Sequence, residues 1–223
     1  MRQKDTHKNH FLKNILLVFI FWSLIALRLA VAASPVTQET LDKIKTKCAE
    51  AYSQELLIKF VADQALKTEK GAFAASSLEA LVDPFTSFLK PNLKFIDLGS
   101  GDGRVVFFAS LFGVDATGIE FDPDLYQISL NAMKNLSDIV DPQRIQFIKG
   151  DFFQHDFSNF DIFYSFGTDT QSGFTKKLLK EMNPGSILIL NGIEETTVPD
   201  GLNLIKIFSD TDGDNDIAVY KRM

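Results

Sequence analysis

The feature that most constrains this chain is the glycine-rich segment at residues 94–103, in which a short apolar run is followed by three closely spaced glycines. The run reads Phe-Ile-Asp-Leu and includes Asp97, and Gly99, Gly101 and Gly103 follow it. A short apolar run is typical of a buried strand, and the glycines let the backbone turn sharply and approach a ligand at the start of a helix. The segment therefore predicts a strand, a turn and a helix with a ligand site at the turn.

From residue 94 onward, apolar runs alternate with segments of helical character. The strand-like runs lie at residues 94–98, 115–119, 145–148, 160–166 and 186–190, and the helical segments lie at residues 103–112, 123–136 and 173–182. Strands that are connected by helices in this way form a parallel sheet with helices on its faces. This part of the chain is therefore predicted to be a Rossmann-like α/β domain.

The last two apolar runs break the alternation. Residues 202–208 and 216–221 both have strand character, and the polar loop at residues 209–215 is too short to hold a helix between them. Such a loop joins two strands of an antiparallel hairpin. We therefore predict that residues 94–223 form a doubly wound, mostly parallel sheet of seven strands that ends in an antiparallel hairpin.

The segment before this domain, residues 35–93, has a helical pattern. Apolar side chains recur at helical spacing over residues 37–68, which predicts one or two amphipathic helices, and the pattern resumes over residues 76–89. Gly71 separates the two stretches, and Pro84 predicts a break or kink in the second. We expect a helical N-terminal extension that covers part of the core.

The first 34 residues have the composition of a membrane-targeting segment. Four Lys or Arg side chains occur before residue 14, and an uncharged, mostly apolar run follows at residues 14–27, before Arg28 and the small residues at positions 29–34. This order predicts a single-pass N-terminal anchor that associates the protein with a membrane. A cleaved signal peptide followed by export, or an organellar presequence, is the alternative.

Composition argues against several classes of site and partner. The formal net charge of −6 disfavours sequence-independent binding to the phosphates of nucleic acids. Cys48 is the only cysteine, so neither an intrachain disulfide nor a cysteine-rich metal site can form. We predict no metal centre and no nucleic acid partner.

Carboxylates follow three successive strands of the predicted sheet. Asp97 lies near the end of the first strand, Glu120 follows the second and Asp151 follows the third. Ligands of doubly wound sheets bind beyond the carboxyl ends of the strands, so these side chains are expected to surround one site. Glu120 is placed to accept hydrogen bonds from both hydroxyls of a ribose. Asp151 could accept a hydrogen bond from an adenine amino group, and Phe152 could pack on the ring.

Glycine spacing and charge discriminate between two kinds of nucleoside cofactor. Sites for dinucleotides follow the pattern G-x-G-x-x-G, but here Gly103 comes one residue early and Arg104 takes the place of the third glycine. Asp97 and Asp102 would repel a pyrophosphate, whereas they attract the ammonium and sulfonium groups of S-adenosylmethionine. The turn therefore predicts an S-adenosylmethionine site and disfavours a nicotinamide oxidoreductase.

Three motifs together resemble the successive cofactor motifs of class I (seven-strand) S-adenosylmethionine-dependent methyltransferases. They are Asp-Leu-Gly-Ser-Gly-Asp-Gly at residues 97–103, Gly-Ile-Glu at residues 118–120 and Gly-Asp-Phe at residues 150–152, with Asn-Pro-Gly-Ser at residues 183–186 similar to a further motif. The resemblance covers the chain from residue 94 to its C-terminus and implies the methyltransferase fold and this cofactor. It implies that the methionine end is held by Asp97, Gly99, Ser100 and Gly101, the ribose by Glu120 and the adenine by Asp151 and Phe152, with Asp102 and Phe121 as further cofactor contacts.

Within this superfamily, the wording of residues 97–106 is similar to that of a small, membrane-anchored protein lysine methyltransferase family, which implies transfer of a methyl group to a protein amino group. Residues 165–170 lack the proline-containing signature expected after the fourth strand of that family. Methylation of a small molecule and a catalytically silent cofactor-binding module therefore stay open as alternatives. For an amine acceptor, Tyr164 and Asp169 lie at or just past the end of this strand, where they could help to remove the proton.

Overall fold

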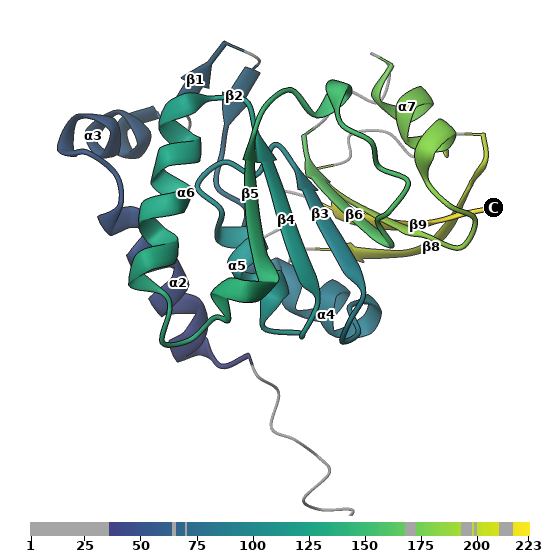
Figure 1. Cartoon of the computed structure of the whole chain (residues 1–223), viewed down its shortest axis with the longest axis horizontal. Helices are drawn as coiled ribbons and strands as arrows, with labels where there is room; N and C mark the ends of the chain where they lie inside the picture. The colour runs from purple at the N-terminus through teal and green to yellow at the C-terminus, as the bar shows by residue number, and fades with distance from the viewer. Residues whose placement is uncertain are drawn as a thin grey trace, which may run out of the picture. The chain divides into compact units, whose positions relative to one another are not determined.

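The computed structural model describes residues 36–63, 66–69, 71–167, 173–192, 198, 200–209 and 216–223. The chain divides into two compact units, Met1–Pro35 and Val36–Met223, and all described residues belong to the second unit, an α/β domain (Figure 1). The predicted anchor at residues 1–34 lies outside the described residues. Within the described part of the chain, no helix is both long and apolar enough to cross a bilayer.

A seven-stranded sheet forms the centre of the domain. Its strands are β3 (Lys94–Leu98), β4 (Asp115–Glu120), β5 (Ile145–Lys149), β6 (Ile162–Phe166), β7 (Ile187–Asn191), β8 (Leu202–Ser209) and β9 (Asp216–Arg222). They lie in the order β5-β4-β3-β6-β7-β9-β8, with parallel neighbours from β5 to β7 and β9 antiparallel to both β7 and β8. The predicted mostly parallel sheet with an antiparallel C-terminal hairpin is confirmed. The strand order reverses between β3 and β6, where sheets of this type form a ligand crevice at their carboxyl ends.

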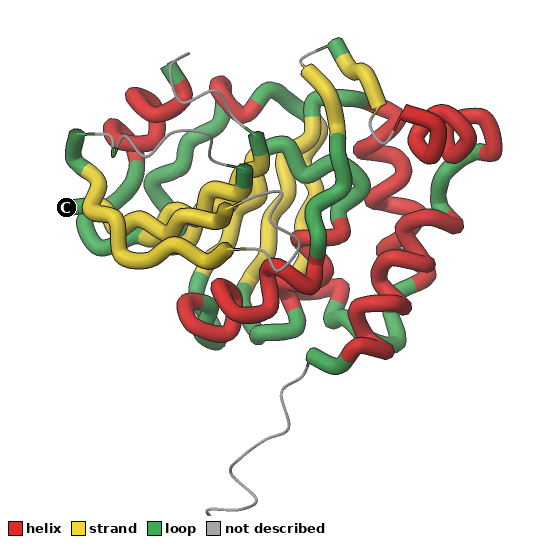
Figure 2. Tube along the Cα trace, turned by 180° about the vertical axis from the view of Figure 1, so that it is seen from behind, coloured by secondary structure: helices red, strands yellow, loops and turns green. Residues whose placement is uncertain are grey.

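Helices cover both faces of this sheet, as a doubly wound fold requires (Figures 1 and 2). They are α2 (Gln38–Glu50), α4 (Leu78–Phe88), α5 (Arg104–Ser110), α6 (Pro123–Asn135) and α7 (Phe174–Glu181). Side chains of α2, α4, α5 and α6 form one core with strand residues such as Phe95 and Tyr164. Side chains of α7 form the other core with Ile96 and Phe163. Neighbouring residues of one strand enter different cores because side chains alternate across a sheet.

The N-terminal extension contains a small hairpin where the sequence pattern predicts helix. Helices occur as expected, in α2 and in α3 (Gln54–Asp63), but strand β1 (Leu66–Thr68) follows and pairs antiparallel with β2 (Gly71–Phe73). The expectation of helix up to residue 68 is therefore wrong. Leu66 is buried and Lys67 is exposed, which is the alternation of a strand. Pairing with β2 gives the backbone N–H and C=O groups the hydrogen bonds that a further helical turn would otherwise have supplied.

The predicted break at Pro84 does not occur, since α4 continues through it to Phe88. Pro84 is buried together with Leu81 and Phe85, and Phe85 packs against Phe95 and Phe108. Burial of this apolar face offsets the backbone hydrogen bond that proline cannot donate. The helix thus covers the sheet without interruption.

Candidate functional site

The glycine turn between β3 and α5 is held against the end of β4 by backbone hydrogen bonds. The N–H groups of Gly99 and Ser100 both donate to the carbonyl of Ile119, each at 3.0 Å. The N–H of Gly101 donates to Glu120 Oε2 at 2.7 Å. Gly101 has a φ of 54°, in the left-handed region where glycine is favoured. The turn thus lies directly beside the carboxyl ends of two neighbouring strands.

Glu120 closes β4 with both carboxylate oxygens bound to backbone amides. Oε2 accepts from Gly101, and Oε1 accepts from the N–H of Asp122 at 2.7 Å. Burial raises the pKa of Glu120, while these amide hydrogen bonds oppose the rise. The carboxylate is therefore held in one orientation by backbone amides where it lines the cavity.

Asp97 is a buried carboxylate that accepts no hydrogen bond from any described residue. It is 2% exposed and lines the cavity. Burial raises its pKa well above the ordinary value, and the nearby charges of Glu120 and Asp102 raise it further. A buried, unpaired acid is costly to a fold, so Asp97 is suited to receive a cationic or hydrogen-bond-donating ligand.

Ser100 is a second polar group without a partner in the described structure. Its Oγ is buried and forms no hydrogen bond. A Cβ at Gly118 in β4 would lie 2.6 Å from this oxygen, so only glycine leaves room for the serine side chain. Gly118 of β4 thus leaves the space that the Ser100 side chain occupies where it lines the cavity.

Asp102 has protein partners on its carboxylate, although the resemblance implies a cofactor contact. Arg104 donates to it from Nε at 3.0 Å to each oxygen and from Nη2 at 2.6 Å, and Tyr52 Oη donates at 3.2 Å. Burial opposes the charge on Arg104, but the Asp102 charge raises the pKa of its guanidinium overall. Asp102 is fully buried and, in this arrangement, fastens the turn to the N-terminal extension.

Asp151 and the two residues after it begin a short 3₁₀ turn beyond β5. The Asp151 side chain accepts from the N–H of Phe153 at 2.9 Å and so caps this turn. Phe152 and Phe153 line the cavity, and so does Phe121, which follows β4. The aromatic part of the predicted adenine site is therefore present at the cavity, while Asp151 acts as a capping residue beside it.

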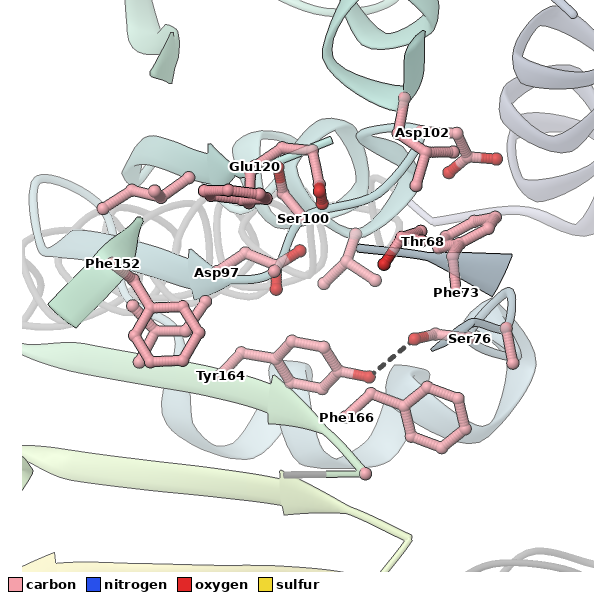
Figure 3. Close-up of a pocket in the computed structure, with 18 of the residues that line it drawn as sticks. Thr68, Phe73, Ser76, Asp97, Ser100, Asp102, Glu120, Phe152, Tyr164 and Phe166 are labelled. Atoms are coloured by element: carbon pink, nitrogen blue, oxygen red, sulfur yellow. Dashed lines mark hydrogen bonds between the residues drawn. The ribbon is translucent and has the colours of Figure 1, made fainter. Parts of the chain in front are cut away.

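Tyr164 lies on β6 directly beside Asp97 of β3 in the sheet register. Its hydroxyl is 2.8 Å from Ser76 Oγ and accepts from Asn191 Nδ2 at 3.0 Å. Burial and the charge of Asp97 raise the pKa of this phenol, so it stays protonated at neutral pH. Figure 3 shows the ring and its contact with Ser76. Asp169, the other predicted catalytic residue, lies outside the described residues.

A cavity of about 390 Å³, within the range typical of ligand pockets, lies at the carboxyl ends of the strands and is lined by most of these residues, though not by Gly101 or Asp151 (Figure 3). The lining includes seven of the predicted residues that carry side chains, namely Asp97, Ser100, Asp102, Glu120, Phe121, Phe152 and Tyr164. It also includes residues that the sequence analysis missed. These are Thr68, Phe73 and Ser76 of the N-terminal extension, Leu125 of α6, Phe166 of β6 and Phe174 of α7.

The lining combines groups suited to a nucleoside with a cationic tail. The cavity has aromatic walls, two buried carboxylates, Asp97 and Glu120, and the Ser100 hydroxyl, which has no hydrogen-bond partner among the described residues. Among the described residues, no group of three or more His, Cys, Asp or Glu is arranged to hold a metal ion. The chemistry of the lining therefore fits S-adenosylmethionine.

The comparisons with known proteins agree with this description. Residues 97–193 match the family model of the ANTKMT methyltransferase domain. None of the curated proteins matches the chain. An RNA methyltransferase from Salinibacter ruber in complex with S-adenosyl-L-homocysteine has a similar structure, with 24% identity and a TM-score of 0.53 over 66% of this chain and 94% of that chain.

Two further solved structures show the same fold. An S-adenosylmethionine-dependent methyltransferase from Thiobacillus denitrificans has 12% identity and a TM-score of 0.51, over 66% of this chain and 92% of that chain. A mutant of MtNAS in complex with S-adenosylmethionine has 14% identity and a TM-score of 0.56, over 82% of this chain and 72% of that chain.

The family match starts at Asp97 and extends past β7, so it contains the glycine turn, Glu120 and the Gly-Asp-Phe motif that ends at Phe152. Residues of each of these motifs line the cavity, among them Asp97, Glu120 and Phe152. Residues 97–193 are thus similar to the ANTKMT methyltransferase domain, and the chain has the fold of S-adenosylmethionine-dependent methyltransferases.

Proposed function

We propose that this protein transfers the methyl group of S-adenosylmethionine to the amino group of a lysine side chain in a protein. The observation that carries the proposal is the aromatic and polar character of the cavity beside Asp97, which is lined there by Tyr164, Phe166 and Ser76. Aromatic faces attract an alkylammonium group and pack on its methylene chain. The resemblance of the glycine motif to a protein lysine methyltransferase family supports the same acceptor.

The cofactor contacts that we propose follow from the unsatisfied groups of the site. Asp97 would bind the ammonium of the methionine end, because it is buried and accepts no hydrogen bond from any described residue. Ser100 would donate or accept through its unpaired hydroxyl, and Glu120 would accept from the ribose hydroxyls. Phe121 and Phe152 would pack against the adenine, with Asp151 holding the turn that positions Phe152.

The protein's part in the reaction is chiefly to position the acceptor. The bound cofactor supplies an activated methyl group, which an amine can displace in line. The neutral Tyr164 hydroxyl, oriented by Asn191 and Ser76, can accept a hydrogen bond from the acceptor N–H and direct the nitrogen lone pair. Because its pKa is raised, Tyr164 is not suited to remove the proton. Asp169 remains our candidate for that step.

The acceptor can be tested by incubating the full chain with methyl-labelled S-adenosylmethionine and a cell extract, followed by mass spectrometry of labelled products. We expect methyl groups on lysine ε-nitrogens of at least one protein, and no such label with the Asp97→Asn variant. Label confined to small molecules would favour small-molecule methylation instead. Absence of any label, under conditions where the chain binds the cofactor, would favour a catalytically silent module.

We also propose that residues 1–34 form a single-pass anchor, with residues 35–93 as an N-terminal extension of helices and one hairpin and residues 94–223 as the catalytic domain. The four basic residues and the apolar run that follows support the anchor. Fractionation of cells that express the chain with a tag at either end tests it. Both tags are expected in the membrane fraction after an alkaline wash, whereas a tag lost from the N-terminus would support a cleaved signal or presequence.

A further inference from the structure

Three aromatic rings of the N-terminal extension form a stacked column. Tyr52 follows α2, Phe60 lies in α3 and Phe73 lies in β2. The ring centroids of Tyr52 and Phe60 are 5.7 Å apart with an angle of 18° between the planes, and those of Phe60 and Phe73 are 5.7 Å apart with an angle of 29°. This aromatic column joins three elements that are separate along the chain.

One end of the aromatic column is fixed to the glycine turn. Tyr52 Oη donates to Asp102 Oδ2 at 3.2 Å, and Arg104 binds the same carboxylate through Nε and Nη2. The Sγ of Cys48, one helical turn before Tyr52, lies 3.8 Å from the carbonyl oxygen of Asp102. Charge-assisted hydrogen bonds in a buried environment are stronger than neutral ones. The base of the column therefore cannot shift without disturbing the turn.

The other end of the aromatic column covers the same turn from the cavity side. A Cβ at Gly101 would lie 2.1 Å from the ring of Phe73, so the ring rests on the backbone of the turn. Phe73 lines the cavity, as Figure 3 shows, whereas Phe60 packs behind it against a cluster that contains Leu125 and Ile128 of α6. The column thus runs from a buried ion pair to the wall of the cofactor site.

We propose that Phe73 contacts the cofactor and closes the methionine end of its site, and that Phe60 and Tyr52 are positioning residues that hold Phe73 in place. The proposal rests on the cofactor contacts proposed for Asp97 and the glycine turn and does not depend on the acceptor. A ring that is already ordered closes the site at little entropic cost, and its face attracts a sulfonium or ammonium group. The N-terminal extension is thereby part of the cofactor site.

The test is the affinity of the full chain for S-adenosylmethionine, measured by isothermal titration calorimetry for the wild type and a set of variants. Phe73→Ala and Phe60→Ala are each expected to weaken binding by about tenfold. Phe60→Tyr keeps the ring and is expected to bind as the wild type does. Ile58→Ala is the matched control, because Ile58 lies on the same helix and is 62% exposed.

Each result decides a separate part of the proposal. If Phe73→Ala binds as tightly as the wild type, Phe73 is not a cofactor contact. If Phe60→Ala and Phe60→Tyr have the same affinity for S-adenosylmethionine, Phe60 does not hold Phe73 in place. If circular dichroism shows that the alanine variants do not fold, Tyr52→Phe tests the positioning role instead, because it removes only the hydroxyl. Weaker affinity for S-adenosylmethionine in this variant supports the positioning role, and unchanged affinity overturns it. A wild type that is folded but does not bind contradicts the proposed cofactor contacts themselves.

Discussion

Asp97 and Tyr164 lie side by side on the parallel strands β3 and β6, at the point where the strand order reverses. Both side chains belong to the same face of the sheet, and the charge of Asp97 contributes to the raised pKa of the Tyr164 phenol. Tyr164 has two hydrogen-bond partners, Ser76 and Asn191, whereas Asp97 accepts from none of the described residues. Tyr164 therefore belongs to a hydrogen-bond network within the protein, whereas the neighbouring Asp97 can accept hydrogen bonds from a ligand.

Replacement of Asp97 by asparagine should separate stability from function. Folding raises the pKa of Asp97, so the folded protein favours the protonated side chain. The contribution of protonated Asp97 to the free energy of unfolding is present below about pH 3.8 and is lost as the pH rises through the pKa of Asp97 in the folded protein. Asp97→Asn removes this loss, so we expect the free energy of unfolding at pH 7 to rise by about 1–2 kcal/mol while cofactor affinity falls. Urea denaturation and calorimetry measure the two effects, and a destabilised variant would contradict the description of Asp97 as an unpaired group.

Cofactor binding should release a proton below the pKa of Asp97 in the free protein. The ammonium of S-adenosylmethionine favours the ionised carboxylate, so affinity is expected to rise with pH until Asp97 is already ionised and then to level off. The charged groups that contribute to this pKa are Glu120 and Asp102, and Glu120 can add its own dependence on pH. Calorimetry in two buffers of different ionisation enthalpy detects the proton. A release that is equally large in Asp97→Asn would assign it to another group.

Alanine at Gly118 should damage the site without straining the backbone. The new Cβ would lie 2.6 Å from Ser100 Oγ and 2.9 Å from Val106, so Ser100 must move out of its position. Overpacking of this kind costs about 1–3 kcal/mol, and we expect cofactor affinity to fall by a similar amount. Thr117→Ala is the control, since Thr117 is the neighbouring buried residue of β4 and faces the other side of the sheet. Equal affinities of the two variants would argue against a role for Ser100.

Removal of the Tyr164 hydroxyl tests whether it orients the acceptor or removes its proton. Tyr164→Phe leaves Asn191 Nδ2 without its buried acceptor, so we expect a loss of stability of about 1–3 kcal/mol. The rate of methylation should fall while the pH at which the rate begins to rise stays the same, because the phenol is protonated over the working range. The comparison is made by measuring the rates of the wild type and of Tyr164→Phe between pH 6 and 9. This range lies below the ordinary pKa of a phenol, which is about 10. A shifted acid limb would show that Tyr164 is the base.

The sequence predicts the sheet well because its strands are short apolar runs that end at glycine or at an acid. Lys94–Leu98 is both the predicted and the observed range of β3, and the predicted C-terminal hairpin pairs as β8 with β9. Local pattern contains this information, since each strand must be apolar enough to enter one of two cores. The short polar loop between β8 and β9 is what predicts that these two strands pair as a hairpin, which places β8 at the edge of the sheet.

The N-terminal wall of the site could not be predicted in the same way. Phe73 reaches the glycine turn because β1 and β2 pair and because Phe60 and Tyr52 stack behind it, and these are contacts between residues far apart in the chain. One partner of Asp102 is likewise distant in the chain, since Tyr52 is 50 residues away, whereas Arg104 is a local partner. Charge at the turn predicts attraction of a cation, but only the structure shows that Asp97 is left unpaired while Asp102 is bound by the protein.

We expect the cavity to bind S-adenosylmethionine through the carboxylates at the ends of β3 and β4. Isothermal titration of the full chain with S-adenosylmethionine tests it most directly, with Asp97→Ala and Glu120→Ala as the variants and circular dichroism to establish that each is folded. We predict one binding site in the wild type and a loss of about 1.5–3 kcal/mol in each variant, the contribution of a hydrogen bond to a charged group. A folded wild type that does not bind, or two variants that both bind as tightly as the wild type, would contradict the claim.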